Sequence, residues 1–293
     1  VLDYSDIPEP EFIGVKSLST DSNDAEKGAI IFHINDLVPY IDWSPFFHTW
    51  ELRGRYPTIF NNEKYGEQAK KLFEDAKTYL EKIVNENLFT AKAVYGFFPA
   101  NSVGDDVEVY SDKSRNKVIC RFHFLRQQIQ KPEGQYNLCL ADFVAPKESG
   151  KTDFIGAFAV TSGHKVKELV ESLKKNHEDY LAIMTEAIAD RLAEAFAEFL
   201  HKRVRIEWGY GKNENLTNDQ LIAEEYRGIR PAAGYPACPD HSEKITLWSL
   251  LNVEKNAGIR LTSSCAMIPA SSVSGLYFAH PESKYFAVGK IGR

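Results

Sequence analysis

The chain has 293 residues, of which 43% are apolar and 12% aromatic, so it can bury a substantial core as one large domain or two small ones. Its formal net charge is −6 at pH 7 without a basic cluster, which makes nucleic acid and anionic membrane surfaces poor candidate partners. The longest uncharged run, Leu261–Pro281, is rich in serine and interrupted by Pro269, which argues against a membrane span.

The N-terminal part of the chain predicts an arm, a strand and a helix. Residues 1–27 are acidic and polar with scattered prolines, a composition typical of an arm or linker that enters from a preceding domain. The segment Gly28–Ile34 (GAIIFHI) predicts a short apolar strand. Lys64–Asn85 has its apolar residues on one side at helical spacing and predicts a helix.

Strand-like runs separated by polar or glycine-containing turns dominate the middle of the chain, and three more lie near its end. They are Ala91–Phe98, Asp106–Tyr110, Lys117–Phe124, Tyr136–Val144, Asp153–Val160, Ile259–Thr262, Gly275–Ala279 and Tyr285–Lys290. Because the connections between consecutive runs are short, we expect the strands to pair antiparallel.

The strongest helical region is Val166–His201, where apolar residues recur every four positions and alanines allow close approach of neighbours. A break is expected near Asn176-His177. Thr217 followed by Gln220 is a capping-box pattern that opens a short helix through Glu225. No composition shift marks a second domain. The sequence therefore predicts one α+β domain with a twisted, mostly antiparallel β-sheet and packed helices.

The segment Tyr226–Lys244, YRGIRPAAGYPACPDHSEK, contains three prolines and two glycines and cannot be a regular helix or a central strand. It predicts a stiff, extended loop. Such a loop carrying Arg230 and Tyr235 suits a small carboxylate-bearing ligand, because little ordering entropy remains to be lost on binding. The alternative is a proline-rich connector between two elements.

This loop resembles the signature of the C-terminal activation domain of cobalamin-dependent methionine synthase, which binds S-adenosylmethionine. Other segments resemble the same family in the same order, over close to the whole chain. They are Tyr40–Pro57, Gly96–Tyr110, Leu125–Gln128, Leu140–Thr161, Ala189–His201, Trp208–Ile222 and Ser272–Ile291.

The resemblance implies a reactivation module. In that family the cobalamin cofactor, bound by a neighbouring domain of the same polypeptide, occasionally oxidises to inactive cob(II)alamin. The activation domain then docks over it, an electron arrives from a flavodoxin-type or related reductase, and S-adenosylmethionine donates a methyl group. The implied enzyme is a cytoplasmic methyltransferase of methionine biosynthesis. We do not expect the isolated chain to catalyse the full reaction or to supply a catalytic residue of its own.

The ends of the chain agree with a domain taken from a longer polypeptide. The sequence starts at Val1 and stops directly after the apolar, strand-like Tyr285–Ile291. We expect an activation domain over residues 28–293, with its native C-terminal tail missing.

Arg230 and Asp42 are the first two candidate ligand contacts. Arg230 carries a planar, permanently charged fork that suits the ligand's carboxylate. Asp42 lies between Ile41 and Trp43 in an apolar stretch and is a candidate partner for the ammonium. From the residues alone, Asp42 is equally well a helix N-cap or turn residue before Pro45. The resemblance favours the ligand role, because the family has a ligand-contacting aspartate at the matching position.

The remaining candidate contacts are aromatic, backbone and acidic. Aromatic faces or hydroxyls are offered to the adenosine or the sulfonium by Tyr235 and, by resemblance, by Tyr285 with its neighbour Phe286. Periodicity alone makes Tyr285 a core residue of a strand. Small side chains leave the backbone open to the adenine edge at Pro231, Ala232 and Ala233. Glu194 and Glu224 match acidic positions near the family's site, although acidic residues on helices are usually solvated.

His241 and Asp190 are assigned by the resemblance to the surface that faces the cobalamin domain. His241 with Cys238 also raises the alternative of a thiol hydrolase, but no orienting group is evident. No companion ligands accompany His241, so no metal site is expected.

The four cysteines are scattered and form no CxxC pair, which fits reduced cytosolic thiols. A free-standing S-adenosylmethionine sensor without chemistry is the other alternative.

Overall fold

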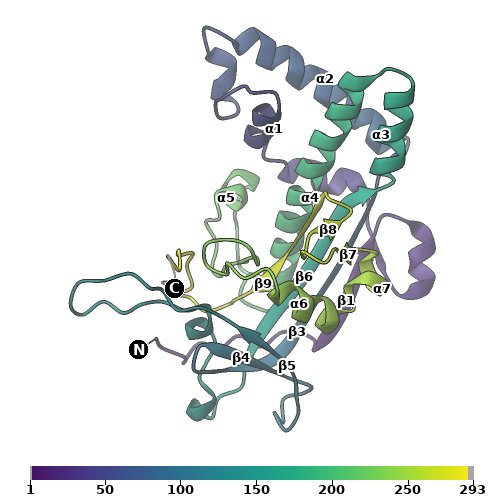
Figure 1. Cartoon of the computed structure of the whole chain (residues 1–293). Helices are drawn as coiled ribbons and strands as arrows, with labels where there is room; N and C mark the ends of the chain where they lie inside the picture. The colour runs from purple at the N-terminus through teal and green to yellow at the C-terminus, as the bar shows by residue number, and fades with distance from the viewer. Residues whose placement is uncertain (1, 290–293) are drawn as a thin grey trace.

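The structure is a computed structural model that describes residues 2–289, and it is organised around a seven-stranded sheet (Figure 1). The strands follow the order β2-β1-β3-β4-β5, while β6 pairs with β3 and carries β9 on its other edge. Every pair is antiparallel except β1 with β2. The strands are β1 Gly14–Ser19, β2 Ile30–Ile31, β3 Thr90–Val103, β4 Asp106–Tyr110, β5 Val118–His123, β6 Asp153–His164 and β9 Ser272–Tyr277; β7 Arg260–Leu261 and β8 Met267–Ile268 form a separate pair.

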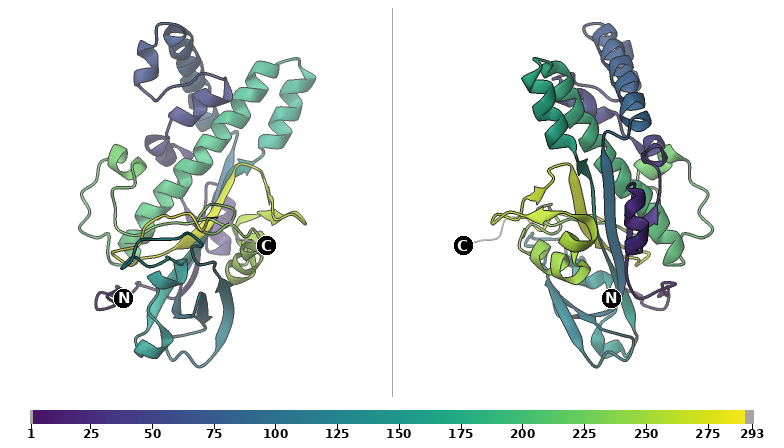
Figure 2. Two further views of the ribbon diagram at one scale, coloured as in Figure 1. Left: turned by 60° about the vertical axis from the view of Figure 1, so that its left-hand side comes forward. Right: turned by 90° about the vertical axis from the view of Figure 1, so that its right-hand side faces the viewer.

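Helices cover both faces of the sheet and extend beyond one of its ends (Figure 2). The first part of α4, together with α2 and α3, projects past the strands (Figures 1 and 2). The helices are α1 Ser44–Thr49, α2 Gly66–Asn85, α3 Val166–Lys175, α4 Asp179–Glu207, α5 Asn218–Ile222, α6 Glu243–Leu251 and α7 Val253–Ala257. Short 3-10 turns are η1 Ser22–Lys27, η2 Ile34–Tyr40, η3 Thr58–Asn61, η4 Leu140–Phe143 and η5 Lys147–Ser149.

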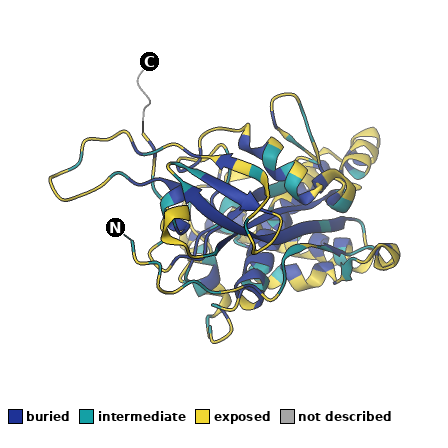
Figure 3. Ribbon diagram, turned by 90° about the horizontal axis from the view of Figure 1, so that it is seen from below, coloured by how far each residue is buried: buried dark blue, intermediate teal, exposed yellow. Residues whose placement is uncertain are grey.

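The central strands are buried on both sides, as the dark ribbon in Figure 3 shows. Successive side chains of a strand point to opposite faces. In β3, Tyr95 and Phe97 therefore join the core built around α4, whereas Val94 and Phe98 join the core that contains residues of α6 and α7. This double burial explains why β3 and β6 are almost continuously apolar although their pairing is antiparallel.

The structure confirms the predicted fold class and several element boundaries. The expected break near Asn176-His177 separates α3, which ends at Lys175, from α4, which begins at Asp179. The capping box is also present: Gln220 donates its backbone N–H to the Thr217 hydroxyl at 3.3 Å, and the Gln220 side chain accepts from the Thr217 N–H at 2.9 Å.

The strand predicted over Tyr136–Val144 is wrong. Its apolar residues from Leu138 onward are buried and Tyr136 is exposed, but this segment is extended loop followed by η4. Two backbone N–H groups bind side chains instead of a ladder: Leu138 donates to the Gln127 side chain at 3.0 Å, and Cys139 donates to the Asp142 carboxylate at 2.9 Å. An apolar run can thus be buried without strand pairing.

The strand predicted over Tyr285–Lys290 is also absent from its described part, residues 285–289. This segment lies beside the proline-rich loop, where Val288 donates to the Pro236 carbonyl at 2.9 Å. A regular ladder cannot continue there because Pro236 has no N–H to return. The apolar segment Gly28–Ile34 likewise forms only the two-residue strand β2 before η2 begins.

The N-terminal segment contributes to the sheet. The sequence predicts an arm over residues 1–27, yet β1 lies within it and pairs with six residues of β3. That part of the segment therefore belongs to the folded body, and its connection to a preceding domain stays a prediction. Across residues 2–289, the helices are too short or too polar to cross a membrane.

Candidate ligand-binding site

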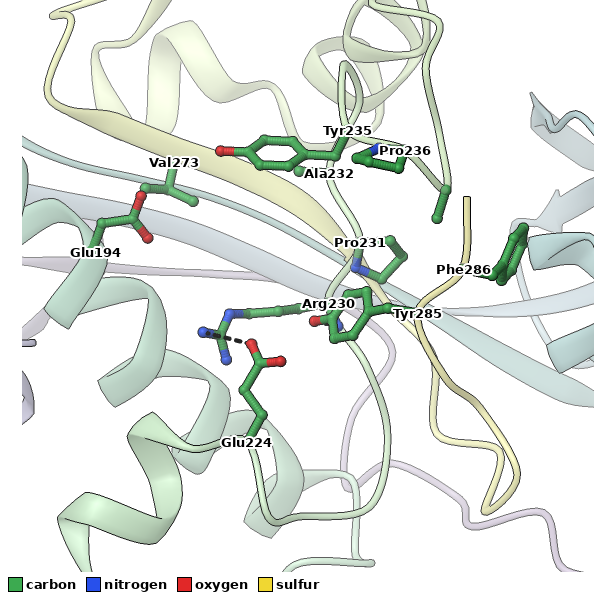
Figure 4. Close-up of a pocket in the computed structure, with 11 residues that line it drawn as sticks. Glu194, Glu224, Arg230, Pro231, Ala232, Tyr235, Pro236, Val273, Tyr285 and Phe286 are labelled. Atoms are coloured by element: carbon green, nitrogen blue, oxygen red, sulfur yellow. Dashed lines mark hydrogen bonds and ion pairs between the residues drawn. The ribbon is translucent and has the colours of Figure 1, made fainter. Parts of the chain in front are cut away.

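A cavity of about 530 Å³ lies where the proline-rich loop crosses β9 and faces α4 (Figure 4). Its volume falls in the range of pockets that hold small organic ligands. Chain segments far apart in sequence line it: α4, the residues after α5, the loop, β9 and the C-terminal segment. The lining residues are Glu194, Glu224, Arg230, Pro231, Ala232, Tyr235, Pro236, Ala237, Val273, Tyr285 and Phe286.

The proline-rich loop is irregular, as predicted, and is fixed along β9 by backbone hydrogen bonds. Ile229 and Phe278 exchange N–H to carbonyl bonds at 3.1 Å, and Leu276 donates to the Pro231 carbonyl at 2.9 Å. Gly275 makes this approach possible, because a Cβ there would lie 2.7 Å from the Pro231 oxygen. The loop is therefore held rigidly before any ligand arrives.

Arg230 points from the loop toward α4, and Figure 4 shows its pair with Glu224. A second glutamate, Glu198, also pairs with it. The NH1 of Arg230 lies 2.8 Å from Glu198, and its NH2 lies 3.4 Å from Glu224. Burial alone would lower the pKa of Arg230, but the combined attraction of Glu198, Tyr226, Tyr285 and Glu224 outweighs it and the pKa is raised. The guanidinium therefore stays positive and is only partly available to a ligand.

The two glutamates differ in exposure. The side chain of Glu198 on α4 is 5% exposed, whereas that of Glu224 is 38% exposed at the cavity. Glu224 adopts φ of +57°, in the left-handed region, two residues after the end of α5. Glu198 was missed by sequence reasoning. Its only signal is its position one helical turn after Glu194, and its partner is distant in the chain.

Asp42 lies in a second hollow of about 310 Å³ that shares Glu194 and Arg230 with the first. Its carboxylate also accepts the backbone N–H of Ser44 at 2.9 Å, at the start of α1. The two roles weighed from the sequence are therefore compatible: Asp42 makes a local turn contact and also faces the hollow beside Arg230.

Charges at these two adjoining hollows are unequal, with four carboxylates against two guanidinium groups. The carboxylates are those of Asp42, Glu194, Glu198 and Glu224, and the guanidinium groups are those of Arg191 and Arg230. This excess of negative charge favours a ligand that carries positive charge.

Aromatic side chains form the rim of the cavity. Tyr235 and Tyr285 are 63% and 46% exposed, respectively. The Tyr285 hydroxyl accepts the backbone N–H of Arg230 at 3.1 Å, which ties the C-terminal segment to the loop. Ala232 lines the cavity, but Ala233 faces a separate small hollow beside Phe122. Two predicted ligand contacts therefore lie outside the cavity: Ala233 in this small hollow and Asp42 in the second hollow.

His241 and Asp190 are exposed and do not line the cavity. The Nδ1 of His241 lies 3.4 Å from the ammonium of Lys244, and Asp190 accepts a hydrogen bond from the Ser271 hydroxyl at 2.6 Å.

Cys238 is buried, which raises the pKa of its thiol to about 12. This state disfavours a nucleophilic thiolate and argues against the thiol hydrolase. Among residues 2–289, no group of three His, Cys, Asp or Glu side chains has a metal-binding arrangement.

Comparison with known proteins gives two agreeing results. A family model described as "Vitamin B12 dependent methionine synthase, activation domain" matches residues 33–293. A solved structure described as the MetH reactivation domain bound to AdoHcy superimposes with a TM-score of 0.92. Its sequence is 51% identical, and the match covers 99% of this chain and 86% of that one.

Proposed function

Because the chain belongs to the activation-domain family of vitamin B12-dependent methionine synthase, we propose that the cavity at Arg230 binds S-adenosylmethionine for reductive methylation of cobalamin. The observation that carries the proposal is this cavity, lined by a fixed loop, an arginine and several carboxylates. It lies in a domain 51% identical to one whose structure holds AdoHcy, the demethylated form of that ligand.

The residues at the cavity fit the chemical groups of the ligand. Arg230 supplies a cation for the carboxylate, and Asp42, Glu194 and Glu224 supply anions for the ammonium and the sulfonium. The exposed rings of Tyr235 and Tyr285, with Phe286 beside them, offer apolar surface to the adenosine. The small side chain of Ala232 leaves its backbone accessible to the adenine edge, whereas the Pro231 carbonyl is bonded to Leu276 and Ala233 faces the separate hollow.

The chain's own work is to bind and orient. S-adenosylmethionine, when bound, supplies an activated methyl group, so the domain needs no general base. The fixed loop and the half-buried Arg230 hold the amino-acid end of the ligand and so set the direction of the sulfonium. Exposed His241 and Asp190 lie outside the cavity and suit contact with the cobalamin-binding domain of the same polypeptide. A flavodoxin-type reductase supplies the electron in this proposal.

A calorimetric titration tests the binding proposal. The chain is titrated with S-adenosylmethionine and with S-adenosylhomocysteine, without metal, flavin or nicotinamide. We expect saturable binding of both at one site. An absence of heat, and of retention in equilibrium dialysis at about 1 mM ligand, would contradict the proposal, because even weak recognition is measurable at that concentration.

A further inference from the structure

The NH1 group of Arg230 is surrounded by protein acceptors on the side away from the cavity. It lies 2.8 Å from Glu198 and 3.2 Å from the Nδ1 of His201, and it also donates to the Tyr226 hydroxyl. NH1 carries only two hydrogens, so these three acceptors use its hydrogen-bonding capacity fully. The NH2 group, by contrast, meets only Glu224 among the described residues, and Glu224 is at the cavity.

The side chains around NH1 are themselves fixed. Glu198 and His201 are three residues apart on α4 and therefore lie on one face of the helix. The His201 ring stacks on Tyr277 at 4.9 Å between centroids and meets the edge of Tyr226 at 4.7 Å. Tyr226 in turn is covered by the guanidinium of Arg205 at 3.8 Å.

His201 must accept from Arg230, since a guanidinium has no acceptor. Its Nδ1 therefore carries no proton. Burial and the two nearby guanidinium groups hold the pKa of His201 well below its usual value, which keeps the ring neutral. A protonated ring would direct an N–H at a cation. The ring is thus in the state that the contact needs.

We infer that Glu198, with His201 and Tyr226 beside it, is a positioning residue: it holds the NH1 edge of Arg230 so that NH2 faces the cavity and receives a ligand carboxylate. This inference rests on the proposed function. It separates the two glutamates by role. Glu198 is the permanent, buried partner of the guanidinium, while exposed Glu224 is the partner that the ligand replaces. A guanidinium that rotates or shifts by about 1 Å loses much of its value to the ligand.

Two substitutions separate position from charge. Glu198→Asp keeps the charge but shortens the side chain, so the carboxylate no longer reaches NH1. Glu198→Gln removes the charge but keeps an oxygen at the same place. Each variant is titrated with S-adenosylhomocysteine, which has the carboxylate, and with 5′-methylthioadenosine, which lacks the amino-acid portion. Glu207→Asp is the matched control, because Glu207 is buried on the same helix but pairs with Arg203 and Tyr95.

We expect Glu198→Asp to weaken S-adenosylhomocysteine binding about tenfold and 5′-methylthioadenosine binding less than about twofold. Glu198→Gln should stay within about threefold for both ligands, and Glu207→Asp should change neither by more than about twofold. Tyr226→Phe, which removes one hydroxyl, should cost about threefold for the carboxylate ligand alone, and it decides the question if Glu198→Asp does not fold. Equal losses for both ligands, or no loss, overturn the inference. If the unaltered chain fails to bind S-adenosylhomocysteine, the proposed function itself is wrong.

Discussion

The imidazole of His241 lies directly on the backbone of Gly234, so closely that a Cβ at residue 234 would be 2.1 Å from the His241 Cε1. Gly234 has φ of +95° and is the residue before Tyr235 at the cavity rim. In this loop, Tyr235 therefore lines the cavity, while the preceding residue, Gly234, packs against the exposed His241. Binding and docking are proposed to use neighbouring parts of one rigid loop without sharing a side chain.

His241→Ala and Asp190→Ala should separate these two roles. Neither residue lines the cavity, so each change should leave S-adenosylhomocysteine affinity within about 0.5 kcal/mol. In the whole methionine synthase that contains the domain, each should slow recovery of methylcobalamin from cob(II)alamin, and turnover of already methylated enzyme should change little. The paired measurements are calorimetry on the chain and reactivation in the whole enzyme. Loss of ligand binding in a folded His241→Ala chain would move the histidine into the pocket.

Replacing Arg230 with lysine should affect ligand binding more than the stability of the fold. Arg230→Lys keeps a positive charge beside Glu198 but replaces a planar fork with one ammonium, so affinity for S-adenosylhomocysteine should fall by about 1–2 kcal/mol. Arg230→Ala should cost about 2–4 kcal/mol of binding. It should also lower the free energy of unfolding by about 3 kcal/mol, because Glu198 is left buried without its partner. Calorimetry and urea unfolding measure the two effects, and equal binding by the lysine variant would contradict the fork contact.

Asp42→Asn tests whether Asp42 acts on the same ligand. The amide oxygen can still accept from the Ser44 N–H, so the free energy of unfolding should change by less than about 0.5 kcal/mol. Affinity for S-adenosylhomocysteine should fall while affinity for 5′-methylthioadenosine stays unchanged, since only the former has an ammonium. Combined with Arg230→Lys, the losses should be non-additive because both groups would contact one zwitterion. Simple addition of the two losses would place them at separate contacts.

Elements with strong local patterns were predictable from the sequence, and pairings between distant segments were not. The helical period and the caps locate the starts of α2, α3 and α5, but α4 runs to Glu207, beyond the predicted end at His201, and α5 ends at Ile222, before the predicted Glu225. Tyr285 illustrates the opposite case: its apolar, aromatic segment has the composition of a strand, but the neighbour it lies against is a loop with prolines, so no ladder forms. Which segment lies beside it is set by tertiary packing, which propensity does not report.

The candidate site shows the same division. The composition of the loop indicated a rigid platform that presents Arg230, and the structure has this platform. The sequence did not predict Glu198 and His201 as site residues, because a glutamate and a histidine on a long helix are usually solvated. They are buried because Arg230, Tyr226 and Tyr277, all more than twenty residues away, pack against that face of α4.

The charge of the site predicts a preference for the sulfonium form of the ligand. Four carboxylates face two guanidinium groups, and S-adenosylmethionine carries one more positive charge than S-adenosylhomocysteine. We expect S-adenosylmethionine to bind more tightly by about 1 kcal/mol at low salt. Raising the ionic strength to about 1 M should narrow this difference, because exposed Glu194 and Glu224 are screened. Tighter binding of the neutral thioether at every salt concentration would contradict this account.

Asp153 at the start of β6 should make stability depend on pH. Burial raises the pKa of its carboxyl to about 6 from the usual 3.8, although the backbone N–H groups of Ala145 and Phe154 oppose the rise. Between pH 4 and 6 the folded chain therefore keeps a proton that the unfolded chain has released. The stabilising contribution of this bound proton is complete below about pH 4 and is lost as pH rises through 6. The free energy of unfolding changes by about 3 kcal/mol over this range.

Asp153→Asn removes this titration, so its free energy of unfolding should vary less with pH over the same window. Urea unfolding at several pH values between 4 and 7, for the unaltered chain and the variant, measures the difference in slope. Asp112→Asn is the control, because Asp112 is exposed and hydrogen bonds from Ser114 and Ser111 lower the pKa of its carboxyl. That control should not flatten the fall in stability between pH 4 and 6. Parallel curves for the unaltered chain and Asp153→Asn would mean that Asp153 is ionised throughout and that its two backbone hydrogen bonds outweigh its burial.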